Sequence, residues 1–138
     1  NAPHQAHGEG GAETARLRVS RVVTVMDAGR ILNPLAARNQ IEGAVVMGIG
    51  MALLEHTSYD PQNGAPMNSN LADYVMAVNA DAPPMEVHFV ASEDAPRGCG
   101  ETGVPPAAPA LANAIFAATG IRARRLPIRP ADLKAAAT

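Results

Sequence analysis

The segment over residues 34–54 constrains the fold more than any other part of the sequence. Asn33 followed by Pro34 is typical of a helix start, because asparagine caps free N–H groups and proline fits the first helical position. Apolar and small residues then recur every three or four positions, which predicts one buried helical face: Ile41, Ala44, Val45, Gly48, Ile49, Ala52 and Leu53. Three glycines lie inside this helix: Gly43, Gly48 and Gly50. Each costs about 1 kcal/mol relative to alanine, so we expect another backbone or a large ligand to approach the helix closely.

Alternating segments before and after this helix predict β-strands. Residues 17–26 alternate at first and are apolar on both faces at their end, which predicts a strand that enters the interior of a sheet. Residues 85–91 place Val87 and Phe89 on one side, which predicts a strand with one buried face. Shorter strands are expected over residues 57–59 and 122–128.

The remaining segments complete an α+β pattern. Pro105 and Pro106 open a second helix that is predicted to run to Ala118, with Gly120 as its C-cap, and residues 131–136 predict a short terminal helix. The resulting order, β-α-β-β-α-β-α, predicts an α+β fold with a mixed sheet and two main helices. Residues 1–15 have no apolar periodicity and predict a flexible leader or linker ahead of a domain over residues 16–138.

Composition excludes several classes of function. The chain has 138 residues, a net charge of -2 and 3% aromatic residues, so it lacks the basic surface and aromatic platforms typical of nucleic-acid-binding proteins. Its one cysteine excludes an internal disulfide and a metal site of several thiolates. No apolar run reaches the roughly 18 residues of a transmembrane helix, and no signal peptide is evident. Because the chain starts with Asn1 and not with methionine, we expect a piece of a longer protein, and a bacterial cytoplasmic or periplasmic location both stay open.

The strongest candidate for chemistry is the run Gly98-Cys99-Gly100-Glu101, inside a glycine-rich loop over residues 92–104. Glycines let a backbone approach a bulky ligand, and free N–H groups at a helix start bind anions. A carboxylate held in such a loop could serve as a general base. The alternative is an ordinary loop with a solvated Glu101, and the short Gly-x-Gly pattern alone favours that alternative.

Other polar residues are weaker candidates. Gln40 lies in the predicted helix ahead of Gly43, where its amide could hydrogen-bond a ligand, although spacing alone favours an ordinary surface glutamine. Cys99 could act as a nucleophile only beside a base or a positive charge; Arg97 is near in sequence, but no histidine is. A basic group near the C-terminus could meet a phosphate or a partner subunit, or could simply be solvated: Arg122, Arg124, Arg125 and Arg129.

Several segments together resemble the C-terminal part of the molybdenum-binding subunit of the xanthine dehydrogenase and aldehyde oxidoreductase family. The matching stretches, in order, are residues 22–34 (VVTVMDAGRILNP), 39–54 (NQIEGAVVMGIGMALL), 68–74 (NSNLADY), 98–101 (GCGE) and 109–127 (PALANAIFAATGIRARRLP). The part from residue 98 to 116 is most similar to the isoquinoline 1-oxidoreductase β-subunit branch, and the middle segment is more similar to aldehyde oxidoreductases. The resemblance implies that residues 16–138 form a C-terminal molybdopterin-binding subdomain of a longer subunit.

The resemblance also implies roles for particular residues. Glu101 matches the glutamate that closes the family's Gly-x-Gly-Glu motif and would be the active-site base beside molybdenum. Gln40 matches the family's pterin-contacting glutamine, and the backbone of Gly98, Cys99 and Gly100 would line the same cofactor. The pterin holds the metal, so no protein ligand to molybdenum is implied. Family members usually carry an aliphatic residue where Cys99 stands.

The implied activity is hydroxylation, with oxygen from water, of an aldehyde or of a carbon next to nitrogen in an N-heterocycle. The implied cofactor is a molybdenum–pterin in its cytosine dinucleotide form. The implied partners are the remainder of the large subunit and a small subunit that carries iron–sulfur clusters, so the chain alone is expected to be inactive. Two alternatives stay open: a non-catalytic interaction module on the same scaffold without cofactor, and an enzyme that depends on Cys99.

Overall fold

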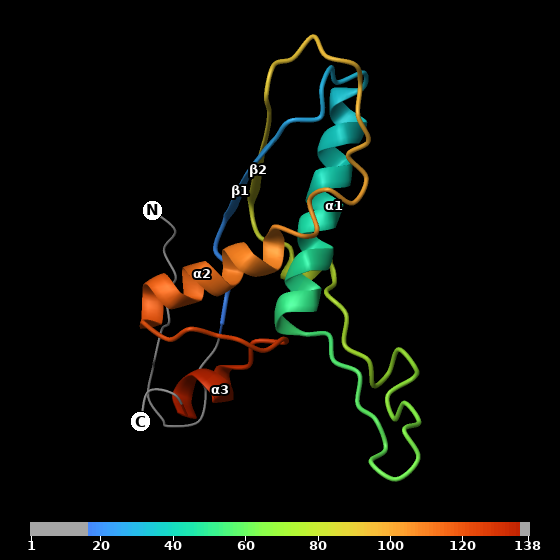
Figure 1. The fold of residues 1–138 in the computed structure, drawn as a ribbon, viewed down its shortest axis with the longest axis vertical. Helices are drawn as coiled ribbons and strands as arrows, with labels where there is room; N and C mark the ends of the chain where they lie inside the picture. The colour runs from blue at the N-terminus through green and yellow to red at the C-terminus, as the bar shows by residue number, and fades with distance from the viewer. Residues whose placement is uncertain (1–16, 136–138) are drawn as a thin grey trace.

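The computed structural model describes residues 17–135, without the side chains of residues 134 and 135. Its elements are β1 (Val22–Met26), α1 (Pro34–Leu53), the short 3-10 helix η1 (Asn79–Asp81), β2 (Met85–Phe89), α2 (Ala107–Thr119) and α3 (Pro130–Ala135) (Figure 1). The α+β class with two main helices is therefore confirmed. The leader predicted over residues 1–15 lies outside the described residues. No helix within residues 17–135 is long and apolar enough to cross a membrane.

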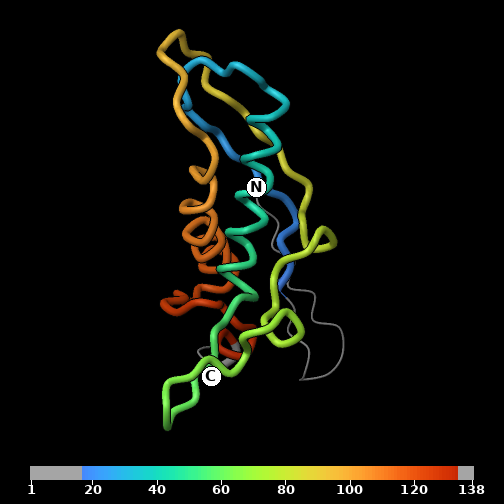
Figure 2. The backbone as a smooth tube through the Cα atoms, turned by 90° about the vertical axis from the view of Figure 1, so that its right-hand side faces the viewer, coloured from blue at the N-terminus to red at the C-terminus, as the bar shows by residue number. Residues whose placement is uncertain are grey.

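The long helix α1 lies at the centre of the fold. The two strands lie on one side of it, and the loop over residues 92–104 lies with α2 on the other (Figures 1 and 2). β1 and β2 pair in parallel, from Val22 opposite Met85 to Met26 opposite Phe89. One buried apolar cluster joins the helices to the sheet: Met26, Ile41, Val45, Ile49, Ala52 and Leu111. The positions that the helical spacing predicts to be buried are thus the ones around which the other elements assemble.

Small residues let other segments approach α1 closely. The helix starts as predicted, because the Asn33 side chain accepts a hydrogen bond of 3.0 Å from a backbone N–H in the first turn. A Cβ at Gly48 would collide with Ala107 of α2, and one at Gly50 would lie 3.3 Å from the Cβ of Ala77. Gly43 differs, since nothing lies within 4 Å of its Cβ position. The predicted close approach of backbone is therefore confirmed at two of the three helix glycines.

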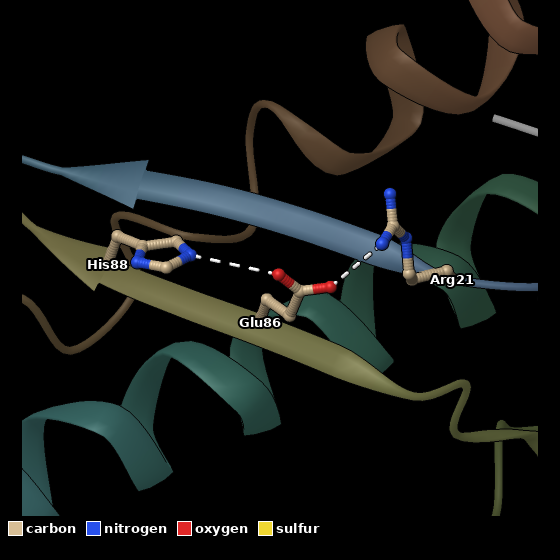
Figure 3. Close-up of polar contacts among 3 residues, drawn as sticks. All are labelled: Arg21, Glu86 and His88. Atoms are coloured by element: carbon tan, nitrogen blue, oxygen red, sulfur yellow. Dashed lines mark hydrogen bonds and ion pairs between the residues drawn. The ribbon is translucent and has the colours of Figure 1, made fainter. Parts of the chain in front are cut away.

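The outer face of the sheet carries exposed apolar and charged side chains. Val23 and Val25 of β1 are 50% and 63% exposed, so the prediction of a strand buried on both faces is wrong for the described chain, in which only α1 covers the sheet. On β2 the predicted alternation is confirmed, with Glu86 and His88 pointing outward. Glu86 lies 2.9 Å from Arg21 Nη1 and 3.9 Å from His88 Nε2 (Figure 3). These exposed pairs stabilise little by themselves.

Two predicted strands do not form within the described residues. Residues 57–59 contribute a single antiparallel bridge, between Tyr59 and Pro66. Residues 122–128 reach the end of α1 instead of the sheet: the Ile128 N–H donates to the Ala52 carbonyl at 2.7 Å, and the Ile128 side chain is buried. The Ile128 N–H is therefore paired with a helix carbonyl and not with the carbonyl of a neighbouring strand. Within residues 17–135 the sheet therefore has two parallel strands.

An arm over residues 56–78 projects beyond the end of α1 (Figure 1). At its base the Tyr74 hydroxyl donates to Glu55 Oε2 at 2.8 Å. This hydrogen bond, with partial desolvation and the nearby negative charge, raises the pKa of Tyr74 above its ordinary value. Large apolar side chains are exposed along the arm: Tyr59, Met67, Leu71, Val75, Met76 and Val78.

The Tyr74–Glu55 contact predicts a measurable change in titration. The Glu55→Gln variant removes the negative charge that disfavours the phenolate, so the pKa of Tyr74 should fall. The raised pKa also means that the contact stabilises the fold at pH values below the ordinary tyrosine pKa, and that this contribution is lost as the pH rises through the folded-state pKa. Ultraviolet absorbance of the phenolate, followed in a Tyr59→Phe background, measures the change. An unaltered titration curve in Glu55→Gln would contradict the contact.

Candidate cofactor site

The glycine-rich loop over residues 92–104 follows the carboxyl end of β2, and the carboxyl ends of parallel strands are a common place for ligand sites. Its first part is tied to the loop after β1, because the Arg30 N–H donates to the Asp94 carbonyl at 3.0 Å. Gly29 has φ 66°, and a Cβ there would collide with the Ala95 carbonyl oxygen. The two loops are therefore fixed against each other through backbone contacts.

The last part of the same loop rests on α1. Gly103 is buried, and a Cβ at this position would lie 3.0 Å from the Ala44 Cβ and 3.5 Å from the Ile41 carbonyl oxygen. Cys99 is half-buried and packs against the apolar cluster that contains Ile41. Glu101 therefore lies between two residues, Cys99 and Gly103, that hold the loop on the helix.

The segment from Gly98 to Glu101 presents unpaired polar groups. Glu101 is exposed, and its carboxylate makes no hydrogen bond or ion pair within residues 17–135. The backbone N–H groups of the same segment also donate to no residue in the described chain. Gly98 and Gly100 have nothing within 4 Å of their Cβ positions, and neither has a positive φ. The space beside these two glycines, where a side chain would stand, is therefore open and is filled by no residue of the described chain.

Gln40 lies on the part of α1 that faces this loop. It is one turn before Ala44, the residue that Gly103 contacts, and residues four apart are neighbours on a helix surface. Its side chain is exposed and makes no hydrogen bond to the described chain. The structure therefore brings the Gln40 turn and the Glu101 loop to the same side of α1, although no hydrogen bond joins the two side chains. Both residues lie on an open surface and not in a closed pocket.

Other polar and charged side chains have ordinary roles. Asp27 accepts a hydrogen bond of 3.2 Å from the Gly29 N–H, and Asp73 accepts one of 2.8 Å from Asn70, so both stabilise turns. Arg122 lies over the Phe116 ring at 3.7 Å. Within residues 17–135 no three His, Cys, Asp or Glu side chains are grouped closely enough to hold a metal ion.

Cys99 has the surroundings of a packing residue. It contacts apolar side chains and makes no hydrogen bond within the described residues. An aliphatic residue would fill the same space, which agrees with what the family usually carries there. A nucleophilic thiolate needs a base or a positive neighbour, and Cys99 makes no hydrogen bond to such a group within the described residues.

The chain belongs to the molybdopterin cofactor-binding domain family, whose model matches residues 9–83 and so includes Gln40. It is 43% identical over 121 residues to PaoC, the molybdenum-binding subunit of an Escherichia coli aldehyde oxidoreductase, in an alignment that covers 83% of the chain and 16% of the relative. It is 35% identical over 115 residues to the isoquinoline 1-oxidoreductase subunit beta of Brevundimonas diminuta, over 83% of the chain and 14% of that protein.

The folds of solved structures support this family assignment. The fold is similar to that of quinoline 2-oxidoreductase from Pseudomonas putida, with a TM-score of 0.81 and 26% identity over 91% of the chain and 17% of that protein. An aldehyde oxidoreductase from Desulfovibrio gigas gives a TM-score of 0.74 with 27% identity, over 88% of the chain and 14% of that protein. The expected resemblance to molybdenum-binding subunits of the xanthine dehydrogenase and aldehyde oxidoreductase family is confirmed. The chain spans about a sixth of the length of such relatives.

The Gly29 contact predicts that one methyl group will loosen the loop. Gly29→Ala places alanine at a positive φ, which costs about 1–2 kcal/mol, and adds a collision with the Ala95 carbonyl. Gly64→Ala is the matched control, because Gly64 has φ 73° with nothing within 4 Å. Urea unfolding of the chain should show a loss of stability about 1 kcal/mol or more larger for Gly29→Ala than for Gly64→Ala. Equal losses would show that the two loops are not in contact.

Proposed function

We propose that this chain forms one wall of the molybdenum–pterin site of a hydroxylase that oxidises an aldehyde or an N-heterocycle. The observation that carries the proposal is the contact of Gly103 with Ile41 and Ala44, because it sets the Glu101 loop beside the turn of α1 that bears Gln40. The names of the relatives, which include an aldehyde oxidoreductase and an isoquinoline 1-oxidoreductase, support the two substrate classes.

The residues on this wall fit a large, flat, polar cofactor. The backbone at Gly98 and Gly100 is bare, so a ring system can approach it without meeting a side chain. The unpaired N–H groups of the loop supply donors, and the Gln40 amide supplies both a donor and an acceptor. When bound, the molybdenum–pterin group supplies the two-electron oxidation and the transfer of water-derived oxygen to the substrate carbon.

Glu101 acts in this proposal as the general base. A carboxylate oxygen of Glu101 accepts the proton that is lost during the reaction, and a positioned base of this kind contributes about 10²–10⁴-fold to the rate. Cys99 and Gly103 hold the segment on α1, which fixes the direction from which the carboxylate reaches the substrate. Glu101 is open to solvent in this chain, so the remainder of the large subunit has to cover it and exclude water.

The complete enzyme requires further parts. The remainder of the large subunit would enclose the cofactor, which we propose to be the cytosine dinucleotide form, and would provide substrate specificity. A small partner subunit with iron–sulfur clusters would remove the electrons. The names of the relatives, which describe subunits, support an enzyme of several chains.

Glu101→Gln in the full-length enzyme tests the proposed base. Glutamine keeps the shape of the side chain but does not accept the proton, so turnover should fall by about 10²-fold or more. The molybdenum content, measured by elemental analysis, should stay unchanged. Glu93→Gln is the matched control, because Glu93 is another exposed carboxylate in the same loop, and this variant should keep its turnover. An unchanged rate in Glu101→Gln would favour the non-catalytic interaction module.

The chain by itself should be inactive. It contributes only one wall, and both Gln40 and Glu101 are exposed in it. Purified chain should contain far less than one molybdenum atom per molecule and should not reduce an artificial electron acceptor when aldehyde is added. Stoichiometric molybdenum together with turnover would show that the remainder of the subunit is not needed.

A further inference from the structure

The three glycines of α1 differ in what surrounds them. Gly48 is buried against Ala107, and Gly50 is buried against Ala77, so in each case the chain itself occupies the space where a side chain would stand. Gly43 is exposed and has nothing within 4 Å of its Cβ position. Its φ is an ordinary helical value, so the backbone conformation does not require glycine either. No described residue therefore explains why this position lacks a side chain.

Glycine at an exposed position inside a helix is unfavourable. It raises the entropy that the chain loses on folding, and alanine would make the helix more stable. Nothing in the described chain offsets this cost at Gly43, whereas close packing offsets it at Gly48 and Gly50. A contact with a group outside residues 17–135 would offset this cost.

The position of Gly43 indicates which group this is. Gly43 lies three residues after Gln40, so the two are neighbours on the surface of α1. The adjacent residue, Ala44, carries the contact with Gly103 that holds the Glu101 loop. Gly43 thus belongs to the same wall as the unpaired amide of Gln40 and the unpaired N–H groups of the loop.

Resting on the function proposed above, we propose that Gly43 is a cofactor-contacting residue: the pterin ring system lies against the bare backbone of α1 at this position. A pterin has a flat ring that fits against bare backbone, and its ring nitrogens and carbonyl oxygen can pair with both the Gln40 amide and the loop N–H groups. The contact extends the cofactor surface by one helical turn beyond Gln40, in the direction of Met47.

The test compares Gly43→Ala with Asn39→Ala in the full-length enzyme. Asn39 is an exposed residue of the same helix, and its replacement also gives alanine. Two quantities are measured: the molybdenum and pterin content of each purified enzyme, and the melting temperature of each subunit produced in cells that cannot make the cofactor. We expect the cofactor-free Gly43→Ala subunit to melt at or above the wild-type temperature. We expect its cofactor content to fall by about tenfold or more, because the added methyl group collides with the ligand alone. Asn39→Ala should keep its cofactor.

Each other result overturns the inference. Full cofactor content in Gly43→Ala would show that the pterin does not touch this position. A lower melting temperature of the cofactor-free Gly43→Ala subunit would show that a protein segment occupies the space. Wild-type enzyme without molybdenum or pterin would refute the proposed function as well, so failure of that function is distinguishable from failure of the Gly43 contact.

Discussion

The contact between the small residues of α1 and the segment that follows β2 determines where every candidate site residue lies. Gly103 reaches the helix at Ile41 and Ala44, and Ala107 reaches it one turn later at Gly48. Side chains of ordinary size at these positions would push the loop and the start of α2 away from the helix. Without that contact, Glu101 and Gln40 would belong to unrelated parts of the surface. Within the described residues, the relative position of the loop and α1 therefore depends on close steric packing.

Both ends of the loop are held mainly by backbone and small residues. At its start, the Arg30 N–H and the positive φ of Gly29 fix it to the loop after β1, and at its end Gly103 fixes it to α1. Between these points, the N–H groups of residues 98–101 and the Glu101 carboxylate have no partner within the described residues. This division lets a rigid scaffold hold the loop while the loop keeps its donors, its open glycines and its carboxylate available to a ligand.

The apolar surfaces that stay exposed agree with a chain that spans about a sixth of its relatives' length. Val23 and Val25 on the outer face of the sheet are 50% and 63% exposed, and Leu71 on the projecting arm is 81% exposed. Apolar surface of this extent is typical of regions that other protein segments cover. The sheet face, the arm and the proposed cofactor wall are three separate places at which the remainder of a subunit would meet this chain.

Much of the fold could be predicted from local pattern. Apolar spacing and the Asn33 cap predict both ends of α1 to within one residue. Gly120 ends α2 in the left-handed conformation, as expected for a C-cap glycine. The strand expected over residues 122–128 does not form, because the Ile128 N–H is hydrogen-bonded to the carbonyl of Ala52, a residue far away in the sequence. The sequence also could not separate Gly43 from Gly48 and Gly50, since only the fold shows which glycine faces another segment. The roles of Glu101 and Gln40 came from the family resemblance; spacing alone favoured ordinary surface residues.

A structure of the full-length subunit with its cofactor bound tests the central claim most directly. It should place a carboxylate oxygen of Glu101 within hydrogen-bond reach, about 2.6–3.2 Å, of the molybdenum coordination sphere or of the substrate. The Gln40 amide should contact the pterin in the same structure. A cofactor seated away from the N-terminal half of α1, or a Glu101 side chain turned into solvent with the cofactor present, would contradict the account.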